Sequence, residues 1–338
     1  MTTSLDSPWS VSDQVLVGQR LMTGFNGHEF NHELEFLIGK LNVGGIILFA
    51  RNIESPAQVR KLCRDAQDYA QSCRLPPLFI AVDQEGGVVA RLKEGFTLFP
   101  KGNPGMTTPE DAVRFARTTA REMKDVGLNM DMAPVLDVEP YGFEGIMHER
   151  VFHGDINDVA DMGCAIVDTL QENNIMAVGK HFPGIGRTTL DSHLDLPYLD
   201  TPLDELHVTD LVPFRRAIDR NVSGIMLSHI LYQALDDEWP ASLSEKIAKD
   251  LLRHQLGYDK LVLTDDLDMK AIRHDMPVLI QRIIAAEIDV VLICHQGPKI
   301  EQAFVELRKF ISATSADQDK GISSLERIVA AKHRFLSP

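Results

Sequence analysis

Short runs of apolar residues recur along the chain, separated by stretches with the spacing of amphipathic helices. The seven clearest runs lie at 44–49, 78–82, 128–135, 175–180, 224–228, 261–265 and 289–294, and a weaker eighth lies at 20–25. Within most runs the apolar residues are continuous and do not alternate with polar ones. Continuous runs are typical of strands buried on both faces, so the pattern predicts a parallel sheet covered by helices.

The segments between these runs carry one apolar face at helical spacing. The clearest are 57–72, 111–126 and 158–172, and in the first of them Val59, Leu62 and Ala66 fall on one side. Eight strands alternating with helices favour a (β/α)₈ TIM-type barrel of the α/β class over an open doubly wound sheet. No GxGxxG motif follows any of the strands, which also argues against a dinucleotide-binding fold.

The pattern predicts one domain over residues 1–338. No repeat, low-complexity segment or linker interrupts the alternation of strands and helices, and barrels of this class often exceed 250 residues as single domains. From about residue 298 the spacing predicts two C-terminal helices, joined by the polar sequence SADQDKG (315–321).

Composition and charge narrow the possible partners. The 338 residues are 44% hydrophobic, and their net charge of −15 argues against nucleic acid or an anionic membrane as partner. No apolar run approaches the roughly 20 residues of a membrane helix, and the N-terminus does not resemble a signal peptide. The four cysteines show no metal-like spacing and are typical of reduced thiols. We therefore expect a cytoplasmic protein, monomeric or weakly dimeric.

Ionisable residues stand at the ends of several predicted strands. They are Asp83, Asp131, Lys180, His181, His229, Asp265 and Asp266, and long polar loops follow at 83–110, 136–157, 181–205 and 229–243. In a barrel, the loops that follow the strands build the active-site face. One pair of such charges, for example Asp83–Lys180 or Asp265–His229, could be explained as a purely structural ion pair. Because buried charge is costly, charge at the ends of five strands predicts a site.

Six motifs together resemble one enzyme family. They are VDQEGG (82–87), APVLDV (133–138), ERVFHGD (149–155), GKHFPGIG (179–186), DSH (191–193) and LTDDLDM (263–269). In this order and spacing the chain resembles the glycoside hydrolase family 3 barrel over roughly residues 20 to 275, specifically the bacterial cytoplasmic β-N-acetylhexosaminidases of peptidoglycan recycling. The resemblance implies a retaining exo-enzyme that removes terminal β-linked N-acetylglucosamine from muropeptides or related oligosaccharides. It implies neither a cofactor nor a metal.

The resemblance also implies the catalytic residues. It selects Asp265 as the nucleophile that forms a covalent glycosyl-enzyme, and its neighbour Asp266 is the rival because only one of two successive strand residues can face the sugar. It assigns the acid/base role to His193, with Asp191 orienting and stabilising the imidazole. A solvated turn at DSH is the simpler structural alternative. Pro183 and two glycines break regular structure here, so 180–193 is predicted to be the end of the fifth strand followed by a mobile loop over the barrel mouth.

The same resemblance implies the sugar-binding residues. They are Asp83, Arg91, Arg150, Lys180 and His181, with Asp83 accepting from hydroxyls, Lys180 and His181 donating to them, and the two arginines donating to the sugar and to Asp83. Three positions depart from the family pattern: Val88 where arginine is common, Ile185 where histidine is common, and Lys260 where glycine is common. The first two bear on the preference beyond the terminal sugar.

Other functions compete with this prediction. A histidine acid/base would tolerate phosphate as acceptor, so a family 3 phosphorylase, or a β-glycosidase of other sugar specificity, is the nearest alternative. A metal-dependent barrel hydrolase could use His181, His229 and Asp265 as ligands, although HxH after the first strand and HExxH are both missing. A non-catalytic sugar-binding barrel is the third possibility.

Overall fold

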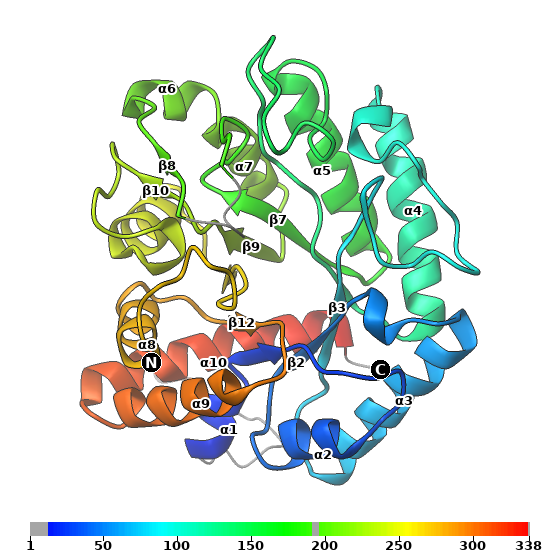
Figure 1. The fold of residues 1–338 in the computed structure, drawn as a ribbon, viewed down its shortest axis with the longest axis vertical. Helices are drawn as coiled ribbons and strands as arrows, with labels where there is room; N and C mark the ends of the chain where they lie inside the picture. Colours follow the sequence, from blue (N-terminus) through cyan, green and yellow to red (C-terminus); the bar gives the residue numbers. More distant parts are fainter. Residues whose placement is uncertain (1–12, 191–195, 337–338) are drawn as a thin grey trace.

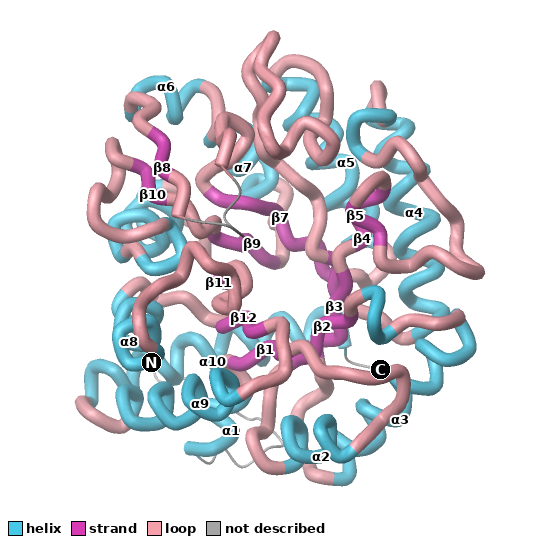
Figure 2. The backbone as a smooth tube through the Cα atoms, in the orientation of Figure 1, coloured by secondary structure: helices cyan, strands magenta, loops and turns pink. Residues whose placement is uncertain are grey.

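Eight parallel strands form a nearly closed barrel in the computed structural model, which describes residues 13–190 and 196–336 (Figures 1 and 2). The strands are β1 (Leu21–Thr23), β2 (Gly45–Leu48), β3 (Phe79–Val82), β6 (Met130–Asp131), β7 (Met176–Phe182), β9 (Gly224–Leu227), β11 (Leu261–Thr264) and β12 (Val291–Ile293). Their order in the sheet is β11-β9-β7-β6-β3-β2-β1-β12. The two end strands meet where Leu263 bridges Val290, and Thr264 N–H donates to the Val290 carbonyl at 3.0 Å. All eight predicted strands and the predicted fold class are confirmed.

The strands bury both faces, as their continuous apolar runs predicted. One face points into the barrel, where Phe79 and Ala81 of β3 pack with Met176 and Val178 of β7 in a central cluster. The other face packs against the helices, where residues such as Ile80 belong to a separate, larger cluster. Because side chains alternate between these faces with a period of two, each strand has one inward row and one outward row.

Helices surround the sheet in a ring (Figure 1). They are α1 (Asp13–Gly18), α2 (His32–Gly39), α3 (Pro56–Ser72), α4 (Pro109–Val126), α5 (Ile156–Glu172), α6 (Leu203–Val208), α7 (Leu211–Asp219), the π-helical segment η4 (Lys246–Gln255), α8 (Met276–Ala285), α9 (Pro298–Ile311) and α10 (Ser315–Leu336). The three clearest predicted helices are α3, α4 and α5. Their starts are set by Ser55, Thr108 and Asp155, whose side chains accept hydrogen bonds from first-turn amides.

Helix α10 covers the end of the barrel where the strands begin. Ile328 and Phe335 of this helix belong to the central cluster inside the barrel. The Lys332 ammonium lies among them and donates to the Gly44 carbonyl, just before β2, at 2.8 Å, and to Gln19 Oε1 at 2.7 Å. Burial, without a carboxylate partner, lowers the pKa of Lys332 well below its ordinary value. The helix therefore forms the floor of the barrel.

The sequence SADQDKG does not join the last two helices, which corrects the prediction. Residues 315–321 form the first turns of α10, and the connection from α9 is only 312–314. Asp317 N–H donates to Thr314 Oγ1 at 3.1 Å, and the Thr314 hydroxyl donates to the Asp317 carboxylate at 2.7 Å. Polar Ser and Asp residues suit a helix start as well as a loop, because they satisfy or complement the free amides of the first turn.

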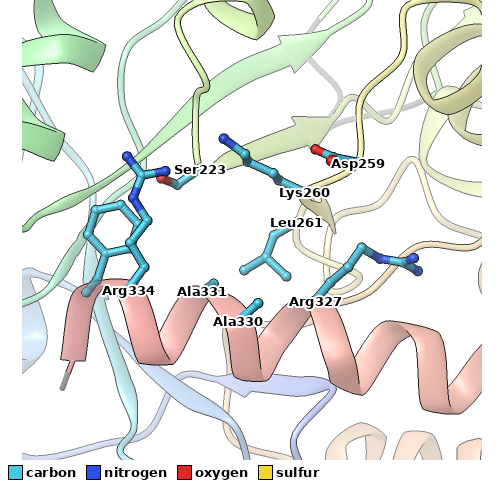
Figure 3. Close-up of a pocket in the computed structure, with 9 residues that line it drawn as sticks. Ser223, Asp259, Lys260, Leu261, Arg327, Ala330, Ala331 and Arg334 are labelled. Carbon is cyan, nitrogen blue, oxygen red and sulfur yellow. The ribbon is translucent and has the colours of Figure 1, made fainter. Parts of the chain in front are cut away.

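A cavity of about 240 Å³ lies at the floor, between α10 and the start of β11 (Figure 3). Lys260 lines it together with Leu261, Arg327 and Arg334. The Lys260 ammonium donates to the carbonyl and to the side-chain oxygen of Asn221. Lys260 precedes β11, whereas Asp265 follows it, so this departure from the family pattern lies at the opposite end of the barrel from the strand-end charges.

The loops that follow the barrel strands contain two small sheets. β4 (Gln84–Gly86) and β5 (Val89–Ala90) form an antiparallel hairpin directly after β3, and β8 (Tyr198–Leu199) pairs in parallel with β10 (Leu231–Tyr232). In the parts of the chain that the structure describes, no helix has the length and apolar character needed to cross a bilayer. The loop elements matter here because β4 carries part of the site described next.

Candidate active site

A cavity of about 370 Å³ opens where the strands end. It is lined by every predicted site residue that the structure describes: Asp83, Arg91, Arg150, Lys180, His181 and Asp265. Asp191 and His193 lie outside the described residues. The structure therefore brings together side chains from β3, the loop before α5, β7 and β11, which are far apart in the sequence.

Three of these side chains reach the cavity by strand periodicity. Asp83 continues the inward row of Phe79 and Ala81, Lys180 continues the inward row of β7, and Asp265 follows Leu263 in β11. Since residues i and i+2 of a strand face the same side, each charge stands on top of an apolar stack. The interior of the barrel is thus apolar below and polar at its mouth.

His181 does not follow this alternation. As the neighbour of Lys180 it is expected to face the other side, yet both residues line the cavity. The pairing of β7 with β9 shifts register between Gly179 and Phe182, which lets two successive side chains turn to one side. Periodicity alone does not place His181 in the site.

Lys180 holds two carboxylates together, those of Asp83 and Glu85. Its ammonium lies 2.8 Å from Asp83 Oδ1 and 2.6 Å from Glu85 Oε1. Burial opposes the charge of Lys180, but Asp83 and Glu85 outweigh it and raise the pKa of the lysine. An ammonium has three donor hydrogens, so two carboxylate contacts leave one for another acceptor.

Arg150 pairs with Glu85 through two hydrogen bonds. Its Nε donates to Glu85 Oε2 at 3.0 Å and its terminal nitrogen donates to Oε1 at 2.8 Å. Burial alone would raise the pKa of Glu85, but Lys180 and Arg150 hold it at about 2. The family resemblance implies that Arg150 donates to the sugar and to Asp83, whereas its carboxylate partner in the structure is Glu85.

His181 is oriented by a carboxylate that the sequence analysis did not select. Its Nδ1 lies 2.8 Å from Asp137 Oδ2, and the other oxygen of Asp137 accepts from the backbone amides of His181 and Ile185. The Arg150 guanidinium approaches Nε2 of His181 at 3.4 Å. Because a guanidinium can only donate, Nε2 acts as acceptor there and Nδ1 carries the proton.

Arg91 contacts the cluster from the opposite wall. One of its terminal nitrogens lies 3.7 Å from Asp83 Oδ2, and its backbone amide donates to the Gln84 side chain at 3.0 Å. The guanidinium lies 5.8 Å from the centre of the Phe49 ring. Asp83 is thus flanked by Lys180 on one oxygen and by Arg91 on the other.

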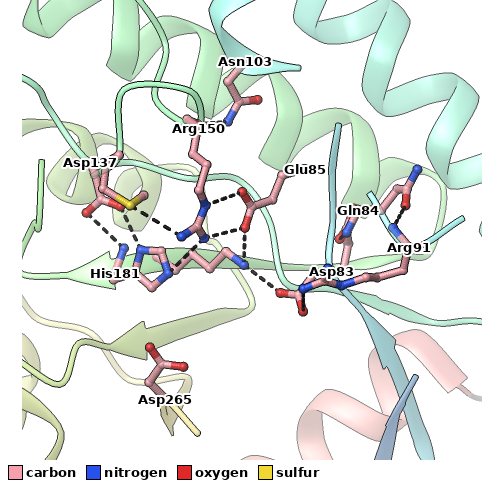
Figure 4. Close-up of polar contacts among 12 residues, drawn as sticks. Asp83, Gln84, Glu85, Arg91, Asn103, Asp137, Arg150, His181 and Asp265 are labelled. Atoms are coloured by element: carbon pink, nitrogen blue, oxygen red, sulfur yellow. Dashed lines mark hydrogen bonds and ion pairs between the residues drawn. The ribbon is translucent and has the colours of Figure 1, made fainter. Parts of the chain in front are cut away.

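Asp265 and Asp266 differ in what surrounds them. Asp265 faces the cavity below His181 (Figure 4). Burial opposes its charge, but other interactions, chiefly those with His229 and His181, outweigh burial and lower its pKa. Burial raises the pKa of Asp266, whose Oδ1 accepts from the amides of Asp268 and Cys294. Both carboxylates border the cavity, but Asp266 is tied to backbone amides through Oδ1, whereas Asp265 faces His181 and His229.

The remaining predictions about this region differ in outcome. Ile185 lines the cavity, whereas Val88 is 55% exposed and borders a neighbouring surface pocket. Glu85 and Asp137 were missed as site residues although both stand inside the quoted motifs VDQEGG and APVLDV. The motifs contained both residues, but the roles of Glu85 and Asp137 depend on contacts with partners from other parts of the chain.

Potential metal ligands of the described residues form two clusters, and the residues of one of them also line the cavity. In residues 13–190 and 196–336, the groups of three His or acidic side chains with ligand geometry are Glu139–His148–His153 and Asp266–Asp268–His295. Neither includes His181, His229 or Asp265. Both ring nitrogens of His229 are engaged, with Ser242 Oγ at 2.6 Å and the Asp266 carbonyl at 2.9 Å. The ligand set named for the metal-hydrolase alternative, His181, His229 and Asp265, is therefore not one of these clusters.

Comparisons with known proteins agree with one another. The model of the glycosyl hydrolase family 3 N-terminal domain matches residues 8–331. A β-hexosaminidase of Methylobacillus flagellatus is 35% identical over 301 residues, which cover 86% of this chain and 83% of that protein. A β-hexosaminidase of Pseudomonas aeruginosa is 34% identical over 86% of each chain.

Solved structures that are similar to this chain include enzymes of the same kind. A family 3 β-N-acetylglucosaminidase of Paenibacillus has a TM-score of 0.91 at 35% identity, covering 97% of this chain and 63% of that one. A β-N-acetylhexosaminidase of Beutenbergia cavernae has a TM-score of 0.86 at 26% identity, covering 96% of this chain and 99% of that one. This chain thus spans less than two thirds of the Paenibacillus protein and nearly all of the Beutenbergia protein.

Proposed function

This chain belongs to glycosyl hydrolase family 3, and from that premise we propose that it is a retaining exo-β-N-acetylhexosaminidase. The proposed reaction removes a terminal β-linked N-acetylglucosamine in two displacements through a covalent glycosyl-aspartate. Relatives named β-hexosaminidase and β-N-acetylglucosaminidase support the sugar. The roles of the individual residues are proposed below from the geometry of the cavity.

Asp265 is the proposed nucleophile. A carboxylate can attack the anomeric carbon only when it is ionised, and the neighbouring His229 and His181 favour the ionised form of Asp265 against the effect of burial. Its position at the end of the inward row of β11 aims it into the cavity. The Asp265 carboxylate facing a cavity of hydroxyl-binding groups is the observation that carries the proposal.

Recognition of the sugar is proposed to use the cluster around Lys180. The lysine retains one donor hydrogen for a hydroxyl after its two carboxylate contacts, and Asp83 can accept from hydroxyls through lone pairs that its cations leave free. Arg91 and Arg150 add charged donors at the cavity wall. His181, whose Nδ1–H is held by Asp137, is proposed to accept from a sugar hydroxyl through Nε2, with that hydroxyl replacing the long contact from Arg150. The family resemblance implies donation by His181 instead.

The acid/base is proposed to be His193, oriented by Asp191. Both lie outside the described residues, so this assignment rests on the DSH motif and the family resemblance. A histidine with a pKa near 6.5 can protonate the leaving oxygen and later deprotonate water.

The finer proposals concern substrate and compartment. We propose muropeptide-type or related oligosaccharides as substrates, on the family branch that the motifs resemble. We propose a cytoplasmic location because all four cysteines are free thiols, as is usual in reducing compartments. The barrel over residues 1–338 is proposed to be one catalytic unit.

The test is a comparison of substrates on the purified chain. We expect hydrolysis of an aryl β-N-acetylglucosaminide with little action on the matched β-glucoside, and release of N-acetylglucosamine from muropeptide and chitin fragments. The reaction is repeated in phosphate buffer, where accumulation of sugar 1-phosphate would identify a phosphorylase instead. A mechanism-based fluorinated sugar is expected to label a peptide that contains Asp265. Equal turnover of the glucoside would overturn the proposed sugar specificity.

A further inference from the structure

Three side chains with metal-binding chemistry gather in the loop between β6 and α5. They are Glu139, His148 and His153, and one ligand atom of each lies within 4.8 Å of the others. His148 Nδ1 and Glu139 Oε2 are 2.5 Å apart, and the two imidazole rings lie with their centres 4.6 Å apart. Two imidazoles and one carboxylate are a ligand set used by zinc proteins that keep a fourth position open.

The loop's own backbone supports two of the three side chains. Glu139 Oε1 accepts from the Gly145 amide at 2.9 Å, which leaves Oε2 directed at His148. The His153 ring is held by a hydrogen bond of 3.0 Å between Nε2 and the His148 carbonyl. Metal ligands in proteins are commonly fixed by such outer contacts, because these orient the ring or carboxylate before the ion arrives.

The electrostatic surroundings favour a cation at this place. The loop carries two further acidic residues, Glu144 and Glu149, close in sequence to His148. No lysine or arginine of the described residues makes an ion pair with Glu139, which contacts His148 and the Gly145 amide. Imidazole nitrogen is a poor ligand for the hard cations Ca²⁺ and Mg²⁺, so the ligand set selects a transition metal such as zinc.

We propose that Glu139, His148 and His153 form a zinc site that clips the loop between β6 and α5. The ion would join the start of this loop to its end. The same loop carries Arg150, which holds Glu85 at the cavity, and Ile146, whose amide donates to the Thr188 carbonyl. Zinc at the clip would therefore stabilise one wall of the cavity while lying outside the reacting groups.

The second cluster of the described residues is a weaker candidate and serves as a control. Its Asp268 already has a cation, because the Lys299 ammonium lies 3.1 Å from Oδ1. The other oxygen of Asp268 accepts from the His295 amide, and Asp266 accepts from the amides of Asp268 and Cys294. A metal there would compete with the Lys299 ammonium for Asp268.

The experiment measures metal binding directly and does not depend on the proposed hydrolase activity. Metal-stripped full-length protein is titrated with Co²⁺, followed by its visible absorption, and with Zn²⁺ in competition. We expect one tight equivalent, and roughly tenfold or greater weakening in His148→Ala, His153→Ala and Glu139→Gln, in line with the usual effect of losing a support of a metal site. Zinc is expected to raise the unfolding temperature of wild type but not of these variants.

Matched controls decide between sites. His254→Asn removes an exposed histidine whose ion-pair partner is Asp250, and this variant is expected to bind metal like wild type. His295→Asn tests the second cluster. The proposal is overturned if the loop variants keep the tight equivalent, if His295→Asn abolishes it, or if wild type binds no zinc. The unfolding temperatures of the metal-free proteins establish that each variant is folded.

Discussion

Asp265 and Asp266 are adjacent in the sequence, yet their surroundings set them apart. The carboxylate of Asp266 accepts backbone amides from two later residues, whereas that of Asp265 faces the cavity and is held ionised by nearby histidines. Both residues border the cavity, but Asp265 follows the inward row of β11, whereas Asp266 is tied to backbone amides through Oδ1. The two residues are of the same type, so the groups around each carboxylate determine its chemical role.

We expect Asp265→Asn to lower kcat by roughly three orders of magnitude or more, since loss of a nucleophile is among the costliest single changes in covalent enzymes. Asp266→Asn is expected to stay within roughly tenfold of wild type, because it weakens backbone hydrogen bonds worth about 1 kcal/mol each. Steady-state kinetics on an aryl β-N-acetylglucosaminide measures both. An inactive Asp266→Asn beside an active Asp265→Asn would reverse the assignment.

His193→Ala is expected to act through the leaving group. Substrates with poor leaving groups need protonation and should lose roughly two to four orders of magnitude in kcat/KM, whereas activated aryl glycosides should lose less in the glycosylation step. Asp191→Ala should show a milder form of the same pattern, because it orients and stabilises the imidazole. The measurement is kcat/KM across leaving groups of graded pKa. A loss that is independent of leaving-group pKa would assign His193 to binding.

The lowered pKa of Glu85, a residue of the site, makes the stability of the folded protein depend on pH. The carboxylate is 2% exposed, and its pKa falls from an ordinary 4.5 to about 2 in the folded protein. A lowered pKa means that the folded state favours the ionised form. Its stabilisation is therefore fully present above about pH 4.5 and is lost as the pH falls toward 2.

Glu85→Gln is expected to lower the free energy of unfolding at pH 7 by about 3 kcal/mol and to raise KM, because Lys180 and Arg150 lose their shared carboxylate. Urea unfolding at pH 7, 5, 4 and 3 should show the gap from wild type shrinking toward acid pH. Glu94→Gln, at an exposed carboxylate, is the control and should leave stability unchanged. A gap that is the same at every pH would contradict the assigned role of Glu85.

At the scale of elements, α10 is part of the barrel and not an appendage. Its buried face enters the central cluster at the start of the strands, and its end is joined to Gly44 through Lys332. Asp289, just before β12, adds a second connection, because it accepts from Ser324 and Arg327 of the helix. The floor formed by α10 thus supports the strands whose other ends carry the site.

Ile328→Ala is expected to lower the free energy of unfolding by about 2–5 kcal/mol, because it removes a fully buried side chain from the floor and leaves a cavity. Ile322→Ala on the same helix is the matched control, since that isoleucine is 37% exposed. It should change stability by less than about 0.5 kcal/mol. Denaturant unfolding measures both variants, and equal losses would show that α10 does not close the barrel as described.

At the scale of the whole molecule, the barrel separates its two ends by chemistry. Charges gather where the strands end, apolar side chains fill the interior, and a helix seals the beginning. Within the charged end, the Lys180 ammonium already lies between Asp83 and Glu85. The Lys180 ammonium therefore neutralises two carboxylates that could otherwise bind a divalent metal.

Turnover is accordingly expected to survive removal of divalent metals. Protein dialysed against a chelator should keep its kcat within about twofold, because the proposed nucleophile and acid/base are side chains alone. Activity is measured before and after dialysis, with metal content determined on the same samples. A loss that zinc or manganese restores would favour the metal-dependent alternative. The zinc clip proposed above stabilises a loop and is compatible with this result.

The sequence by itself determined the local elements of this protein. Continuous apolar runs located all eight strands, helical spacing located α3, α4 and α5, and the ordered motifs identified the family. These features are encoded within a few residues of one another, because burial on two faces or on one stripe imposes a short period. Even the charges of Asp83, Lys180 and Asp265 could be expected at strand ends.

The tertiary structure alone decided which charges pair. Arg150 meets Glu85 across 65 residues of sequence and His181 meets Asp137 across 44, and no local period records such contacts. The register shift in β7 turned His181 inward against the alternation, and the hydroxyl of Thr314 made a helix start from a sequence predicted to be a linker. Pairing energies depend on burial and on partners brought together by folding, so the sequence located the site while the folded barrel set its electrostatics.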